Sequence, residues 1–153
     1  MPVIENPQSL EGRRGSGYPA PFQAGYRGRI TRALTGPLGL TQFGDNVTTL
    51  EPGAKSAERH WHAKEDEFVY MLEGELVLIT DEGERVLTPG MAAGFPAGVA
   101  NGHHLVNKST RPATYLEIGT RSPDEVATYP DIDLSVIKTN GVAKSFYKNG
   151  TPY

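Results

Sequence analysis

The 153-residue chain contains no cysteine. Disulfides and thiolate ligands are therefore excluded, and a bound metal ion would depend on histidine, carboxylate or backbone oxygen ligands. No apolar run is long enough for a transmembrane helix, and residues 1–19 lack the apolar stretch of a secretory signal. These absences predict a cytoplasmic protein with no membrane partner.

The chain also lacks a concentrated basic segment of the kind that nucleic-acid-binding proteins carry. Its net charge is −3, with +3 over residues 1–40 and −5 over residues 60–120. We therefore expect no nucleic-acid partner. The basic N-terminal part has two interpretations: a solvated or partner-wrapping extension, or a segment in which Arg27, Arg29 or Arg32 meets an anionic ligand.

Helical periodicity is missing as well, whereas 18 glycines and 12 prolines predict many turns. Short β-rich runs recur between turn signals, which favours an all-β fold, a small antiparallel β-barrel or jelly roll. Strands are expected within residues 28–34, 40–53, 67–72, 75–80, 85–88, 91–98, 103–107 and 113–120, with one or two more around Asn140-Gly141. We predict an N-terminal arm (1–39), a barrel (40–120) and a C-terminal extension packing on the barrel (121–153).

The run EFVYML, residues 67–72, is apolar almost throughout and does not alternate. This pattern predicts a strand buried on both faces, one inside the barrel and one against the arm or a partner. Because exposed flat strands invite aggregation, we expect a homodimer that covers it.

All four histidines lie in two short segments, HWH at 60–62 and the pair His103-His104. Alternate residues of a strand point to the same face, so His60 and His62 project together. Glu67 opens the next predicted strand, where its carboxylate could complete the site. We predict one divalent metal ion (Fe, Mn, Zn or Ni) at this cluster, although a histidine in a core is often only hydrogen-bonded.

These segments resemble the two motifs of the cupin superfamily. Gly53, the HWH segment, Glu67 and Gly74 follow the first motif, with one extra residue after Gly53. Gly90, Pro96-Ala97-Gly98, His103 and Asn107 follow the second, with two extra residues before the histidine. The resemblance covers about residues 40–120. It implies the cupin barrel and the metal ligands His60, His62, Glu67 and His103, with His104 as the alternative to His103.

The residues that would act on a substrate are less clearly marked. Tyr70, Glu117 and Arg59 are candidates for acid–base or anion contacts, and Asn46 lies on a strand that could reach the cavity. An open coordination position can polarise a carbonyl, activate water or bind O₂ beside a substrate.

Three functions fit these observations. The first is a metal-dependent enzyme acting on a small oxygenated metabolite, of dioxygenase, decarboxylase or isomerase type. The second is a non-catalytic binder or sensor of a small sugar or carboxylate. The third is a structural module with an incidental ion. In the first two the partner is a small-molecule ligand.

Overall fold

The computed structural model describes all residues, 1–153, and consists almost entirely of antiparallel strands in three sheets. The predicted all-β fold is confirmed. Helix is confined to a short α1 (Thr35–Leu38) and two 3₁₀ turns, Pro7–Ser9 and Ala20–Phe22. No helix is long and apolar enough to cross a membrane.

The largest sheet has six strands in the order β1-β2-β3-β10-β5-β8. Their bounds are β1 Arg13–Arg14, β2 Arg29–Ala33, β3 Phe43–Leu50, β10 Ala113–Thr120, β5 Glu67–Glu73 and β8 Ala92–Phe95. In β10, Tyr115 faces Met71 of β5, and Glu117 faces Val69, so these four side chains share the inner face of the sheet. The inner face therefore carries both core residues and a carboxylate.

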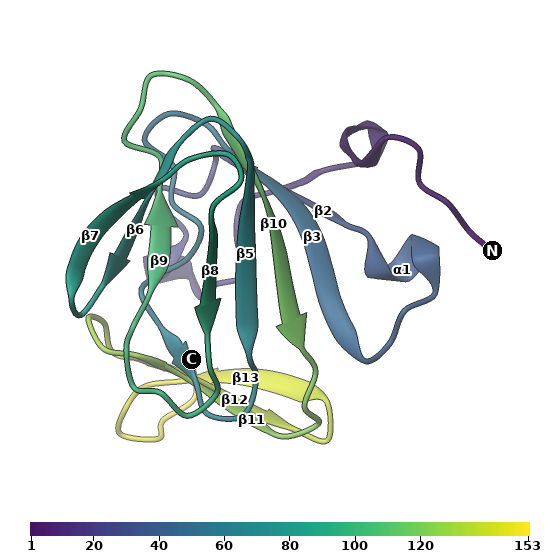
Figure 1. The fold of residues 1–153 in the computed structure, drawn as a ribbon. Coiled ribbons are helices and arrows are strands. Elements are labelled where there is room, and N and C mark those ends of the chain that lie inside the picture. Colours follow the sequence, from purple (N-terminus) through teal and green to yellow (C-terminus); the bar gives the residue numbers. More distant parts are fainter.

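A three-stranded sheet, β7-β6-β9, packs against the first (Figure 1). Its strands are β6 Leu76–Thr80, β7 Gly83–Leu87 and β9 His104–Val106. One buried cluster joins both sheets, with Met71 and Tyr115 from the first packed among Leu76, Leu87 and Leu105 from the second. Burial of each such side chain contributes roughly 1.5–3 kcal/mol, so this cluster holds the barrel closed.

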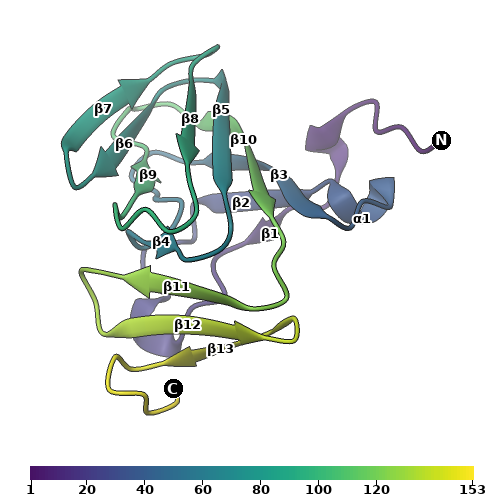
Figure 2. The same cartoon turned by 60° about the horizontal axis from the view of Figure 1, so that its bottom comes forward.

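The third sheet, β13-β12-β11-β4, lies across one end of the barrel (Figure 2). Its strands are β4 Trp61–His62, β11 Glu125–Tyr129, β12 Leu134–Thr139 and β13 Val142–Phe146. Its buried residues, Ala127, Tyr129 and Leu134, pack against Tyr18 and Phe22 of the N-terminal segment. The one or two strands predicted around Asn140-Gly141 are β12 and β13, joined by a turn that places both residues at positive φ, whereas β11 was not predicted.

Gly74 follows β5 in the left-handed region, at φ 74°. A Cβ at this position would lie 2.7 Å from the carbonyl oxygen of Pro112 and 2.8 Å from Ala113 Cα. Only glycine satisfies both the backbone conformation and the space, which accounts for its place in the first motif.

The burial of β5 differs from the expectation. Val69 and Met71 are buried, whereas the alternate residues Phe68, Tyr70 and Leu72 are 39%, 38% and 46% exposed. Of the two covers predicted for the outer face of this strand, the arm is ruled out, because it contributes β1 and β2 to the far edge of the sheet and does not lie over β5; the partner stays a prediction. The strand alternates in burial although its residues are apolar on both faces.

Candidate metal centre

The two histidine segments are brought together by backbone hydrogen bonds. His60 N–H donates to the carbonyl of His103 at 3.2 Å, and His103 N–H donates to the carbonyl of His60 at 2.9 Å. His62 lies on β4, which β11 holds through the pairing of His62 with Ala127. Separate stretches of chain therefore meet where β5 begins at Glu67.

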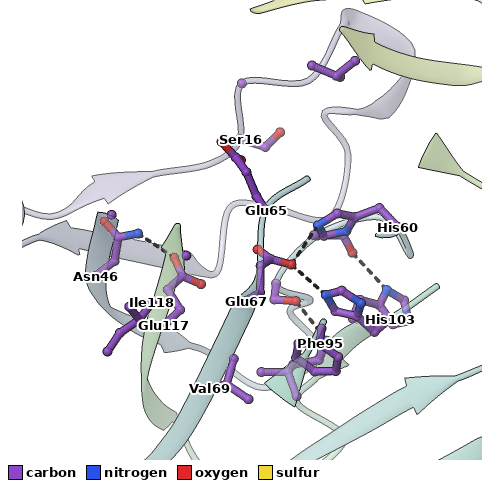
Figure 3. Close-up of a pocket in the computed structure, with 18 of the residues that line it drawn as sticks. Ser16, Asn46, His60, Glu65, Glu67, Val69, Phe95, His103, Glu117 and Ile118 are labelled. Carbon is purple, nitrogen blue, oxygen red and sulfur yellow. Dashed lines mark hydrogen bonds and ion pairs between the residues drawn. The ribbon is translucent and has the colours of Figure 1, made fainter. Parts of the chain in front are cut away.

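Three imidazole nitrogens converge on one carboxylate oxygen, and Figure 3 shows two of them, from His60 and His103, beside Glu67. Glu67 Oε2 lies 3.6 Å from His60 Nε2, 3.5 Å from His62 Nε2 and 2.8 Å from His103 Nε2. The ligand atoms of His60, His62 and Glu67 all lie within 4.8 Å of one another, so this group could hold a metal ion. A set of imidazoles with one carboxylate suits a divalent first-row metal.

His60 and Glu67 are held in the charge states that a metal requires. Burial lowers the pKa of His60 to about 4, so its imidazole is neutral near pH 7. Burial by itself would raise the pKa of Glu67, but the hydrogen bond with His103 and the electrostatic interactions with the neighbouring histidines lower it to about 2. Neutral imidazole and ionised carboxylate are the ligand forms.

The histidine rings are oriented by contacts behind the site. His60 Nδ1 lies 2.8 Å from the carbonyl of Glu58, which places the proton on Nδ1 and leaves Nε2 free to ligate. The ring of His103 stacks on Phe95 with centroids 3.6 Å apart. These contacts aim the Nε2 atoms toward Glu67.

The structure distinguishes between the two adjacent histidines. His103 Nε2 contacts Glu67, whereas His104 Nδ1 lies 2.9 Å from the carbonyl of Ala57. His103 thus lies in the cluster and His104 does not.

A second group, His62, Glu65 and Glu125, also has ligand atoms within 4.8 Å of one another. The Glu125 carboxylate already accepts hydrogen bonds from the backbone N–H groups of Ala63, Lys64 and Val126. Glu65 pairs with a lysine. The carboxylates of this group therefore have structural partners, unlike Glu67, whose neighbours are the histidines.

A cavity of about 580 Å³ opens in front of the cluster. His60, Glu67 and His103 line one side, and Glu117 and Asn46 line another (Figure 3). Asn46 Nδ2 donates to Glu117 Oε1 at 2.9 Å, and Thr48 Oγ1 donates to the same oxygen at 3.2 Å. Because both bonds go to Oε1, Oε2 is left for a ligand in the cavity.

The other two acid–base candidates lie outside this cavity. Tyr70 projects from the outer face of β5, so its hydroxyl cannot reach the site, and we withdraw it. Arg59 is bound by Asp131, at 2.8 and 2.7 Å, and by Asp81, in a clamp between two surface turns. The Arg59 guanidinium is therefore engaged in ion pairs that link the two turns.

Sequence reasoning did not single out several cavity residues. Arg13 and Ser16 come from the N-terminal segment and Arg121 follows β10, and all three line the cavity. Arg29, one of three arginines considered for an anion, also lines it, whereas Arg27 and Arg32 do not. The excess positive charge of residues 1–40 was the available signal, but it does not show which side of a strand each arginine occupies.

Comparison with known proteins shows which family the chain belongs to. The family model of the cupin domain matches residues 46–119. A crystal structure of a sugar phosphate isomerase from the cupin superfamily, from Silicibacter pomeroyi, is 46% identical, covers 95% of this chain and 93% of its own, and superposes with a TM-score of 0.91. The chain belongs to the cupin superfamily. No curated protein matches it significantly.

Other cupins share less of the sequence. A protein from Acidithiobacillus ferrooxidans, provisionally named a sugar phosphate isomerase, is 30% identical over 82% of this chain and 80% of its own, with a TM-score of 0.74. A polyketide cyclase from Streptomyces resistomycificus is 22% identical over 78% of this chain and 80% of its own, with a TM-score of 0.63. The likeness to the polyketide cyclase, at 22% identity, shows only that the two proteins share a fold.

Proposed function

We propose that this cupin is a metal-dependent enzyme that isomerises a small hydroxycarbonyl metabolite. The observation that carries the proposal is that Glu117 lines the same cavity as His60, Glu67 and His103, from a different side. A carboxylate facing a metal centre provides a base and an electrophile for one bound molecule. The two relatives at 46% and 30% identity whose names include sugar phosphate isomerase support this reaction class.

The proposed ion is one divalent first-row metal, such as Fe, Mn, Zn or Ni, held by His60, His62, Glu67 and His103. When bound, it would polarise the substrate carbonyl as a Lewis acid. The buried rings and the low pKa of His60 favour a metal over protons at this position.

Glu117 is the residue that we assign to proton transfer. Its Oε2 would take the proton from the carbon beside the carbonyl and return it to the neighbouring carbon, while a hydroxyl proton moves between the two oxygens. The bonds broken and formed balance, and no oxidant or reductant is needed. Asn46 and Thr48 hold Oε1, so the carboxylate is oriented before substrate arrives.

The test is proton exchange in D₂O. Metal-loaded protein is incubated with a panel of aldoses, ketoses and their phosphates, and deuterium incorporation and isomer formation are followed by NMR. We expect exchange at the carbon beside the carbonyl, and its loss in Glu117→Gln with metal content unchanged. Oxygen uptake without exchange would instead assign an oxygenase, and tight retention without turnover would assign a non-catalytic binder.

We also propose that the chain forms a homodimer through the outer face of β5. Phe68, Tyr70 and Leu72 form an exposed apolar row on a strand that has neighbours on both sides. A second copy covering this row would remove apolar surface from water.

A further inference from the structure

Three arginines line the same cavity as the histidine cluster. Arg29 lies on β2, Arg13 on β1 and Arg121 just after β10. All three fall outside residues 46–119, the part of the chain that the cupin family model matches. They are thus supplied by segments that flank the matched region.

The pairing of β1 with β2 explains why Arg13 reaches the cavity. Arg13 is paired with Thr31, whereas the next residue, Arg14, is paired with Ile30 and points to the opposite face. There Arg14 forms an ion pair with Glu51 at 3.0 Å. Two adjacent arginines therefore have different surroundings, one in the cavity and one outside it.

Arg121 approaches the cavity across Gly44. A Cβ on Gly44 would lie 3.2 Å from Arg121 Nη2 and 3.5 Å from its Nε, so the absence of a side chain leaves room for the guanidinium. Gly44 is paired with Gly119 on β10, and both glycines line the cavity. The surface of the sheet between Arg121 and Glu67 therefore carries no side chain at Gly44 or Gly119.

The positive charge in this part of the cavity is only partly compensated. Arg29 Nη2 lies 3.6 Å from Glu117 Oε1, a distance that leaves the pair loose. Arg13 and Arg121 form no ion pair in the structure, and Lys138 is taken by Glu65. With Glu67 committed to the proposed metal, the cavity has two guanidinium groups without a carboxylate partner.

Buried donors without partners lie in the same cavity. Arg29 Nε, Ser16 Oγ and the Tyr115 hydroxyl are buried and make no hydrogen bond. Tyr115 is completely buried, and burial raises its pKa well above the ordinary value, so the hydroxyl keeps its proton. Unpaired buried donors are costly, and an oxygen-rich ligand would satisfy them.

We propose that Arg13, Arg29 and Arg121 bind an oxyanion group, phosphate or carboxylate, of the substrate that the proposed metal holds in the same cavity. This inference rests on the proposed function, since it orients the substrate of that reaction. Arg29 reaches from β2 to within 3.6 Å of Glu117 Oε1, and Glu117 lines the same cavity as Glu67. Guanidinium forks match both oxyanions.

The test measures binding rather than turnover. Ribose 5-phosphate, ribose and malate are titrated calorimetrically into wild-type protein and into the variants Arg13→Gln and Arg121→Gln. Arg14→Gln is the matched control, because it removes the same charge one residue away on the outer side. We expect at least one anionic probe to bind more tightly than ribose, and each cavity variant to weaken that binding about tenfold. Arg14→Gln should bind like the wild type.

The outcome identifies the anion and separates this inference from the proposed function. Preference for ribose 5-phosphate assigns phosphate, and preference for malate assigns carboxylate. Binding that does not depend on Arg13 or Arg121, in variants that melt like the wild type, would overturn the subsite. The titrations are repeated on protein treated with a chelator: arginine-dependent binding that persists there supports the subsite even if the isomerase proposal fails.

Discussion

The two faces of the six-stranded sheet differ in chemistry although their residues alternate along the same strands. On the inner face Glu67, Glu117 and Arg29 line the cavity. On the outer face of β5, Tyr70 and Leu72 are apolar and exposed. A single strand thus contributes to the candidate site and to the proposed dimer surface, so changes at neighbouring positions should have unrelated effects.

The largest effect is expected at the histidines that face Glu67. His62→Ala should weaken metal binding by at least about a hundredfold, because even residues that only orient a ligand contribute 10–100-fold. The rise in melting temperature on adding metal should disappear with it. His104→Ala, whose ring faces the Ala57 carbonyl, is the control and should keep the metal response. Equal responses in both variants would contradict the assignment.

The next effect concerns Glu117. Glu117→Gln should lower kcat by about 10²–10⁴-fold, the usual contribution of a positioned acid–base group, with metal content unchanged. Steady-state kinetics with the substrate found in the exchange assay measures it. Glu73→Gln, an exposed carboxylate at the end of β5, should have no effect. A kcat unaffected by the loss of Glu117 would remove it from proton transfer.

How much of the fold and of the candidate site could be predicted from the sequence depends on how far apart in the chain the residues of each pattern lie. The HWH segment, Glu67 and His103 were found because strand alternation and motif spacing are local. Arg13 and Arg121 were missed because their placement depends on the register of β1 against β2 and on the open space over Gly44. Neither is visible in a pattern of neighbouring residues. The exposure of Tyr70 in the single chain was not predicted, because an apolar run does not show whether the arm or a partner covers its outer face.

Lowering the pH should destabilise the metal-free protein through protonation of His60. His60 has its pKa lowered to about 4 in the folded chain, below its ordinary 6.5, so protonation favours the unfolded chain. Its contribution is present above about pH 6.5 and is lost as the pH falls toward about 4. Between about pH 7.5 and about pH 5 we expect the free energy of unfolding to fall by on the order of 1–2 kcal/mol from this group.

Urea unfolding of metal-free protein at the two pH values measures this loss. In His60→Gln the difference between the two pH values should shrink by that amount, whatever the variant's absolute stability. An unchanged difference would mean that His60 does not carry the pH dependence.

The smallest effect on activity is expected from the outer face. Leu72→Lys should weaken the homodimer by introducing a charge into the apolar row, while metal binding and turnover stay as in the wild type. Sedimentation velocity at micromolar concentration measures the change. Val86→Lys, a comparably exposed apolar residue on β7, is the control and should remain dimeric. A wild-type monomer would refute the dimer.

The central claim is that His60, His62, Glu67 and His103 share one ion facing the cavity. The most direct measurement is a crystal structure of the metal-loaded protein with anomalous scattering recorded at the absorption edge of the metal. We predict a single anomalous peak about 2.0–2.3 Å from the Nε2 atoms of these histidines and from a Glu67 oxygen. A peak placed instead among His62, Glu65 and Glu125, or no peak at either position, would contradict the account.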